Sequence, residues 1–328
     1  MARHSVLVTR RIPEPGISLL QGECDVEVFG PDRPMRREEL LEAVRGRHGL
    51  LTLLTETIDA EVMERAGPQL KVVANMAVGF NNVDVREATR RGIAVTNTPG
   101  VLTETTADLA WALLMAVARR LVEADRYMRD GRYTGWSPTL FLGTDVWGKT
   151  LGIVGLGRIG QAVARRARGF QMRIVYHDAR RLSPDKEQEL GVEYRSLDDL
   201  LRESDFVTLH VDLNETTWHL IDERALSLMK PTAYLINTSR GPVVDEKALV
   251  RALREGRLAG AGLDVFENEP AMEPGLAEMS NVVVLPHIAS ASQETRSLMA
   301  RMAAENLLAA LAGRRPPNLV NPEVWREP

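Results

Sequence analysis

Residues 150–160 read Thr-Leu-Gly-Ile-Val-Gly-Leu-Gly-Arg-Ile-Gly, and the spacing of their glycines decides the fold class. An apolar run leads into Gly155, and an amphipathic helical pattern follows over 161–168. Gly155 permits a tight turn, Gly157 lets the backbone approach a pyrophosphate, and Gly160 lets helix and strand pack closely. The N–H groups at the start of such a helix attract phosphate. The segment therefore predicts a strand, turn and helix that bind a dinucleotide.

The next predicted strand, 173–176, leads to an acidic residue. Asp178 lies 18 positions beyond Gly160, close to the spacing of the carboxylate that binds ribose hydroxyls. A carboxylate there repels a 2′-phosphate, so we expect NAD to be preferred. Arg180 and Arg181 follow directly, and they can either hold a phosphate or lie on the surface as a solvated pair. NADP therefore stays possible.

Short apolar runs alternate with helical patterns on both sides of this turn. The strand candidates before it are 6–8, 26–29, 50–54, 71–74 and 94–96, and those from it onward are 151–154, 173–176, 206–209, 234–236, 261–263 and 282–285. One long helix is expected over 103–130, a loop rich in glycine and aromatics over 131–148, and a final helix over 292–312. Such alternation predicts α/β domains with parallel sheets covered by helices.

Composition excludes several functional classes. The chain has 328 residues, enough for about two domains, and a net charge of -4 that offers no basic surface for nucleic acid. No stretch is long and apolar enough to be a signal peptide or a membrane span. Cys24 is the only cysteine, so a reducing cytoplasm is expected. The six histidines are scattered, so no metal site is expected.

Polar residues follow three of the later strands, where chemistry collects in open α/β sheets. Arg240 offers a planar fork for a carboxylate, and His287 can give a proton to a carbonyl oxygen. A carboxylate from the segment 264–269 would orient that histidine and favour its protonated form. This set suits reduction of a 2-oxo acid. His210 also ends a strand, and the residues alone do not rank it below His287, nor exclude surface or capping roles for the others.

Six segments together make the chain similar to the D-isomer-specific 2-hydroxyacid dehydrogenase family over nearly its whole length. They are Ala77–Asp84, Thr103–Asp108, Gly155–Gly160, Asn237–Gly241, Gly262–Pro270 and Pro286–Ile288. The resemblance implies that Arg240 binds the substrate, that His287 is the general acid and that Glu269 supports it. It thereby selects His287 over His210. Two positions depart from the family pattern: Asp212 stands where proline is usual, and Ala289 where glycine is usual.

The resemblance also implies which residues bind the two ligands. Cofactor contacts are expected from Thr105, Gly155, Gly157, Arg158, Ile159, Gly160, Asp178, Arg180, Arg181, Thr238 and Asp264, the last through the nicotinamide amide. Substrate contacts are expected from Val78, Gly79, Arg240, His287, Ser290 and Trp136, with backbone groups of Val78 and Gly79 holding the carboxylate.

The architecture implied by the family is discontinuous. Residues 1–100 plus 288–328 would form a substrate-binding domain and 101–287 a dinucleotide-binding Rossmann domain. Both would be Rossmann-like or flavodoxin-like, with the active-site cleft between them. Residues alone leave open whether the final helix returns to the first domain.

Within the family, the segment around Trp136 is most similar to glyoxylate/hydroxypyruvate reductases. There the matching tryptophan reaches the substrate site of the partner subunit, so a homodimer is expected. The loop also holds Trp147, for which local packing beside the first fingerprint strand is favoured. The alternatives are another D-2-hydroxyacid dehydrogenase, of D-3-phosphoglycerate or D-lactate type, and a non-enzymatic corepressor that senses NAD.

Overall fold

The computed structural model describes residues 3–325, which form two compact units. Residues up to Leu102 and from Ala291 onward form a five-stranded unit, and Thr103–Ser290 form a seven-stranded unit. The boundaries implied by the family resemblance were residues 1–100 plus 288–328 for the first unit and 101–287 for the second. Within the described range, no helix has both the length and the apolarity needed to cross a membrane.

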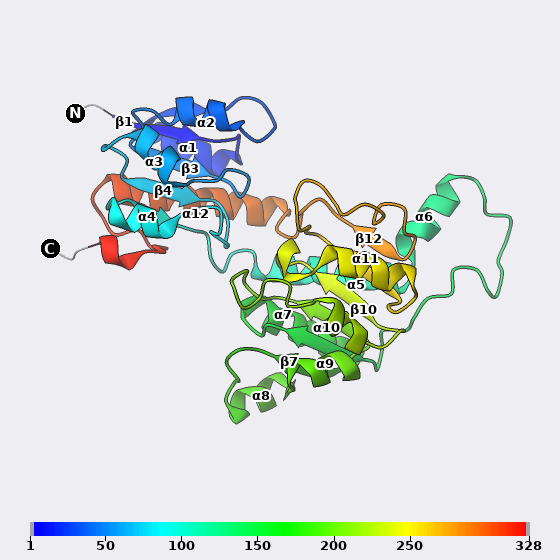
Figure 1. The fold of residues 1–328 in the computed structure, drawn as a ribbon. Coiled ribbons are helices and arrows are strands. Elements are labelled where there is room, and N and C mark those ends of the chain that lie inside the picture. Colours follow the sequence, from blue (N-terminus) through cyan, green and yellow to red (C-terminus); the bar gives the residue numbers. More distant parts are fainter. Residues whose placement is uncertain (1–2, 326–328) are drawn as a thin grey trace. The chain divides into compact units, whose positions relative to one another are not determined.

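The five-stranded unit is built on a parallel sheet in the order β2-β1-β3-β4-β5. Its strands are β1 (His4–Val8), β2 (Cys24–Val28), β3 (Gly49–Thr52), β4 (Val72–Asn75) and β5 (Ala94–Thr96). Its helices are α1 (Glu14–Glu23), α2 (Arg37–Ala43), α3 (Ala60–Ala66), α4 (Val85–Arg90) and α12 (Gln293–Leu311). Alternate strand residues face opposite layers, so α1 and α12 share one core and α2, α3 and α4 the other (Figure 1).

The seven-stranded unit holds a second parallel sheet, in the order β12-β11-β10-β9-β6-β7-β8. Its strands are β6 (Thr150–Val154), β7 (Arg173–His177), β8 (Glu193–Tyr194), β9 (Phe206–Leu209), β10 (Tyr234–Asn237), β11 (Gly260–Leu263) and β12 (Val282–Val284). The two-residue β8 was not predicted. The helices are α5 (Thr103–Ala118), α6 (Leu121–Arg129), α7 (Arg158–Ala167), α8 (Pro184–Leu190), α9 (Leu197–Glu203), α10 (Glu223–Leu228) and α11 (Glu246–Arg254). Helices α5 and α7 cover one face of this sheet, and α9, α10 and α11 the other. The parallel α/β class predicted from the sequence is thus confirmed.

The single helix predicted over 103–130 is wrong. It breaks after Ala118, and Arg120 takes a left-handed conformation with φ of 54°. The cause is a distant segment: the Thr144 N–H donates to the Ala118 carbonyl at 2.8 Å, and Gly143 packs against the same carbonyl so closely that a side chain would overlap it. Helix α6 consequently projects from the rest of the seven-stranded unit and buries none of its residues (Figure 1).

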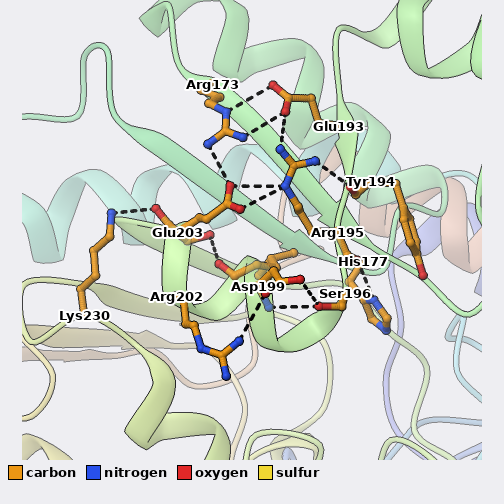
Figure 2. A network of polar contacts seen from close by, with 12 residues as sticks. Arg173, His177, Glu193, Tyr194, Arg195, Ser196, Asp199, Arg202, Glu203 and Lys230 are labelled. Atoms are coloured by element: carbon orange, nitrogen blue, oxygen red, sulfur yellow. Dashed lines mark hydrogen bonds and ion pairs between the residues drawn. The ribbon is translucent and has the colours of Figure 1, made fainter.

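A closed ring of ion pairs ties β7 and β8 to α9 (Figure 2). Arg173 contacts Glu193 at 3.0 Å and Glu203 at 2.9 Å. Arg195 contacts the same two carboxylates at 2.6 and 3.1 Å. Each of the four charges thus has two opposite neighbours, which makes the ring more favourable than isolated surface pairs.

Glu203→Gln, which breaks the ring at one carboxylate, should lower the free energy of unfolding by about 1 kcal/mol and the Tm by a few degrees. The loss should shrink at high salt, because these charges are partly exposed. Thermal denaturation at low and high ionic strength measures both. Asp125→Asn is the matched control, since within residues 3–325 Asp125 forms a single ion pair, with Arg129, on an exposed helix face. Equal losses in the two variants would contradict a cooperative ring.

Candidate active site

The glycine-rich turn between β6 and α7 leaves room that side chains would fill. Gly155 has a φ of 89°, a region that favours glycine. A side chain at Gly160 would overlap the Gly155 carbonyl, so this glycine lets α7 pack on the strand. Gly157 faces open space and is exposed. The first helical hydrogen bond runs from the Gln161 N–H to the Gly157 carbonyl, which leaves the N–H groups of the first turn directed at that space.

Asp178 lies beside this turn and braces it. The Leu156 N–H donates to Asp178 Oδ2 at 2.8 Å, and the Arg180 N–H donates to Oδ1 at 3.1 Å. A carboxylate oxygen can accept more than one hydrogen bond, so the group can still accept bonds from a ribose.

The two arginines after Asp178 differ in their surroundings. Arg181 holds Glu187 through two hydrogen bonds of 2.8 and 2.9 Å, and its guanidinium lies 5.2 Å from the centre of the Tyr194 ring. Arg180 is exposed, and its side chain forms no ion pair within residues 3–325. The sequence did not distinguish the two arginines. In the structure Arg181 has a carboxylate partner, and Arg180 has none within residues 3–325.

His287 and Glu269 form a dyad at the carboxyl edge of the sheet. His287 Nδ1 lies 2.9 Å from Glu269 Oε2, while Oε1 of the same carboxylate accepts the Phe266 N–H at 3.1 Å. Burial alone would raise the pKa of Glu269, but the hydrogen bond from His287, that N–H group and the charge of Arg240 together hold the pKa below its usual value. The carboxylate therefore stays ionised and leaves Nε2 of the ring as the nitrogen that can serve a ligand.

The fully buried Asp264 sets the position of this dyad. Its two carboxylate oxygens accept the N–H groups of Ile288 and Ala289, each at 2.8 Å, and its carbonyl accepts the His287 N–H at 2.9 Å. The resemblance had implied a cofactor contact for Asp264. In the structure, its carboxylate holds the two residues that follow the histidine, and its backbone carbonyl holds the N–H group of the histidine itself.

Arg240 lies on the neighbouring loop, between β10 and a short turn. Its carbonyl accepts a 3.0 Å hydrogen bond from Asn237 Nδ2, and its Nη1 donates to the Ser239 carbonyl at 2.7 Å. Burial lowers the pKa of Arg240, and the charges of Glu269 and Asp212 partly offset this effect. A guanidinium near Glu269 and largely withdrawn from water is suited to hold an anionic ligand.

His210, the rival acid, has different surroundings. Its Nε2 lies 2.9 Å from Thr208 Oγ1, and it has no carboxylate partner within the described residues. Burial lowers the pKa of His210 to about 3, so the ring is neutral near pH 7. It is therefore a poor proton donor at neutral pH.

Two buried polar atoms at this edge have no hydrogen-bond partner within the described residues: His210 Nδ1 and Thr238 Oγ1. Both follow strands adjacent in the sheet, β9 and β10, and the His210 carbonyl packs against Gly155. Buried polar groups are rarely left unsatisfied, so these atoms fit a polar ligand at this edge. Together with the open turn at Gly157 and the carboxylate of Asp178, they fit a dinucleotide.

Val78 and Gly79 belong to the five-stranded unit. The Val78 carbonyl accepts a hydrogen bond from Asn97 Nδ2 at 2.8 Å, and the Gly79 carbonyl accepts one from Asn75 Nδ2 at 2.9 Å. Both residues are half-buried. A carboxylate only accepts hydrogen bonds, so the peptide N–H groups of these residues are the ones suited to meet it, while the carbonyl bonds fix the orientation of the loop. Asn75 and Asn97, which hold these carbonyls, were not among the predicted site residues, although each directly ends or follows an apolar strand pattern.

The remaining candidates are spread over several elements. Thr105 lies in the first turn of α5, Arg158 and Ile159 open α7, and Ser290 ends the seven-stranded unit. Trp136 is 82% exposed on the loop after α6. Trp147 is 64% exposed, so its expected local packing is wrong.

The chain is similar to known proteins along most of its length. Residues 111–289 match the NAD binding domain of the D-isomer specific 2-hydroxyacid dehydrogenases. A glyoxylate reductase of Korarchaeum cryptofilum is 59% identical over 321 residues, which cover 97% of this chain and 96% of that protein.

Two solved structures share the fold over nearly their full length. A protein from Thermus thermophilus is 51% identical with a TM-score of 0.90, covering 96% of this chain and 99% of that one. An NADPH-dependent glyoxylate/hydroxypyruvate reductase of Sinorhizobium meliloti, solved with NADP and malonate, is 35% identical with a TM-score of 0.87 and covers 100% and 99%. The chain therefore belongs to the D-isomer specific 2-hydroxyacid dehydrogenase family.

Proposed function

We propose that this chain reduces glyoxylate or hydroxypyruvate to the corresponding 2-hydroxy acid with a nicotinamide dinucleotide. The observation that carries the proposal is the dyad of His287 and Glu269, 2.9 Å apart, with the charge of Arg240 acting on the same carboxylate. The high identity to a glyoxylate reductase supports the substrate class. The single cysteine, Cys24, is compatible with a reducing cytoplasm, which we propose as the location.

In the proposed mechanism, Arg240 and the N–H groups of Val78 and Gly79 hold the substrate carboxylate and orient the adjacent carbonyl. When bound, the dinucleotide supplies the hydride that adds to the carbonyl carbon. His287 gives the proton from Nε2 to the carbonyl oxygen as the electron pair of the C=O bond moves onto it. Glu269 accepts from Nδ1, fixes the tautomer and stabilises the imidazolium before transfer.

The first test replaces each candidate acid. His287→Ala should lower kcat for glyoxylate reduction about a hundredfold or more, the usual cost of losing a general acid. In the wild type, reduction should decline as pH rises, because the acid must carry its proton. His210→Asn should keep this pH dependence, since the lowered pKa of His210 makes its ring neutral throughout the range. Steady-state rates from pH 5 to 9 measure both effects. Near-normal turnover in His287→Ala would refute the assignment.

We further propose that NADH is preferred over NADPH. Asp178 would repel a 2′-phosphate, and Arg181 is held by Glu187, so only Arg180 remains to attract one. The dinucleotide site would be completed by Thr105, Arg158, Ile159, Thr238 and the three glycines of the turn.

Asp178→Ser should raise the ratio of kcat/KM with NADPH to kcat/KM with NADH, because a serine removes the repulsion and leaves Arg180 in place. Asp185→Ser, at an exposed acid of the following helix, is the matched control and should leave the ratio unchanged. A wild-type enzyme with the higher kcat/KM for NADPH would overturn the proposed preference.

We also propose an obligate homodimer in which α6 and the following loop cross to a second copy. This arm exposes large apolar side chains at Leu121, Val122, Met128, Tyr133, Trp136, Leu142 and Trp147. An exposed apolar surface of this kind marks an interaction site, and a twofold axis would exchange the arm reciprocally. Trp136 would then wall the substrate site of the partner, with Ser290 near the same ligand.

Trp136→Ala should relax selection against bulkier 2-oxo acids while the KM for the dinucleotide stays unchanged, because the indole occupies space that a long substrate tail needs. A panel of 2-oxo acids measures the profile, and sedimentation measures the assembly. Trp218→Ala is the control, an exposed tryptophan outside the arm. An active monomer would remove the cross-subunit role, and an unchanged profile would show that Trp136 does not select the substrate.

A further inference from the structure

Glu246, the first residue of α11, is a buried carboxylate that binds a loop instead of a cation. It is 3% exposed. Its Oε1 accepts the Glu267 N–H at 2.7 Å, and its Oε2 accepts the Glu273 N–H at 3.2 Å. Within residues 3–325 no Lys, Arg or His forms an ion pair with it. Two backbone groups six positions apart are thus fastened to one side chain.

The segment fastened in this way, 267–273, contains the partner of the acid. Between the two fastened ends, the Ala271 N–H donates to the Asn268 carbonyl at 2.9 Å and closes a turn. Glu269 lies in that turn, with one oxygen on the Phe266 N–H and the other on His287. A displacement of either end would therefore move the Glu269 carboxylate relative to the imidazole.

The beginning of the segment is held a second time. Glu267 Oε2 accepts the Glu246 N–H at 3.3 Å, and its Oε1 lies 3.0 Å from His219 Nε2. A side chain at Gly241 would overlap the backbone of Phe266 and Glu267, so the loop that carries Arg240 also packs directly on this segment. Glu246 thus connects α11 to both loops of the site.

The electrostatic surroundings of Glu246 are unfavourable for a carboxylate, so stabilising the fold is not a sufficient reason for its presence. Burial raises the pKa of Glu246, and the charges of Glu267 and Glu273 raise it further, while the two backbone N–H groups partly offset the effect. A buried carboxylate near two other carboxylates is unfavourable unless its hydrogen bonds secure a particular conformation.

We propose that Glu246 is a positioning residue whose carboxylate clamps both ends of segment 267–273 and thereby holds Glu269 against His287. The role rests on the proposed function, because it concerns the acid of that reaction. Glu246 itself touches neither reactant. It acts through the distance between Glu269 and His287, so its loss should reproduce the loss of Glu269.

The experiment compares Glu246→Gln and Glu246→Asp with Glu255→Gln. Glutamine keeps one acceptor and loses the other, and aspartate is one methylene too short to reach both N–H groups. Glu255 is an exposed residue at the end of the same helix, paired with Arg257, and serves as control. Both Glu246 variants should lower kcat about tenfold to a hundredfold, the scale of a misplaced group, and should move the alkaline limb of the pH profile to lower pH. The KM for the dinucleotide should not change.

A double-mutant cycle separates positioning from stability. In a Glu269→Gln background, Glu246→Gln should have almost no further effect on kcat, because the two changes remove the same interaction. Effects that multiply independently, or a lowered Tm with an unchanged pH profile, would overturn the proposal. The Asp variant keeps this test available if the Gln variant does not fold.

A measurement without turnover separates this proposal from the proposed function. NMR of histidine-labelled, cofactor-free protein at one fixed pH follows the ring resonances of His287, identified by their absence in His287→Ala. Glu246→Gln and Glu269→Gln should change these resonances in the same way, because both variants disturb the carboxylate that contacts Nδ1. If the change appears in a protein that reduces no 2-oxo acid, the proposed function fails and the clamp stands. If the His287 resonances are unchanged in Glu246→Gln, the clamp is refuted even in an active enzyme.

Discussion

The hydrogen bonds that the Asp264 carboxylate accepts from the N–H groups of Ile288 and Ala289 are the contacts on which the candidate site depends. They join the ends of β11 and β12, where the apolar core stops. Burial raises the pKa of Asp264, and the two N–H groups counteract that rise. Asp178 uses the same device at the glycine-rich turn, and Glu246 uses it at the loop that carries Glu269. The loops at this edge are therefore fixed by hydrogen bonds from backbone N–H groups to carboxylates. These bonds hold the loops from within, so the outer polar groups of the loops can meet a ligand.

These bonds also account for the conformation of the histidine. His287 has a φ of 55°, a left-handed conformation that is unfavourable for a residue with a side chain. The N–H group of His287 donates to the Asp264 carbonyl, and the N–H group of the next residue, Ile288, donates to the Asp264 carboxylate. Because the backbone is held on both sides, the ring reaches Glu269 without the freedom of an ordinary loop side chain. Strain of this kind concentrates where orientation matters for chemistry.

Local patterns of the sequence predicted the strands well, and distant contacts explain the errors. Apolar runs marked nearly every strand of both sheets, since buried parallel strands are apolar on both faces. The helix expected over 103–130 breaks because Thr144 takes the Ala118 carbonyl, a contact between residues 26 positions apart that no periodicity contains. The two residues of β8 are too few to form a pattern. Trp147 was expected to pack locally because it lies beside the first fingerprint strand in the sequence, yet it is exposed with the apolar arm. The positions of Arg240, Glu269 and His287 after strands were visible in the sequence, whereas the clamp at Glu246 depends on two backbone groups that have no sequence signature.

The surroundings of Arg181 show how such distant partners bear on ligand choice. Hydrogen bonds from Arg181 and from Tyr176 lower the pKa of Glu187 to about 2, so this carboxylate is ionised at any working pH. Burial and the bond to Glu187 raise the pKa of Tyr176 to about 12, so the phenol keeps its proton and its role as donor. Arg181 can approach a phosphate near Asp178 only by leaving Glu187 and the aromatic ring of Tyr194. The residue after Tyr194 is Arg195, which belongs to the ring of ion pairs between β7, β8 and α9. Two carboxylates thus arrange the polar groups at this edge: Asp178 holds the glycine-rich turn, and Glu187 holds Arg181.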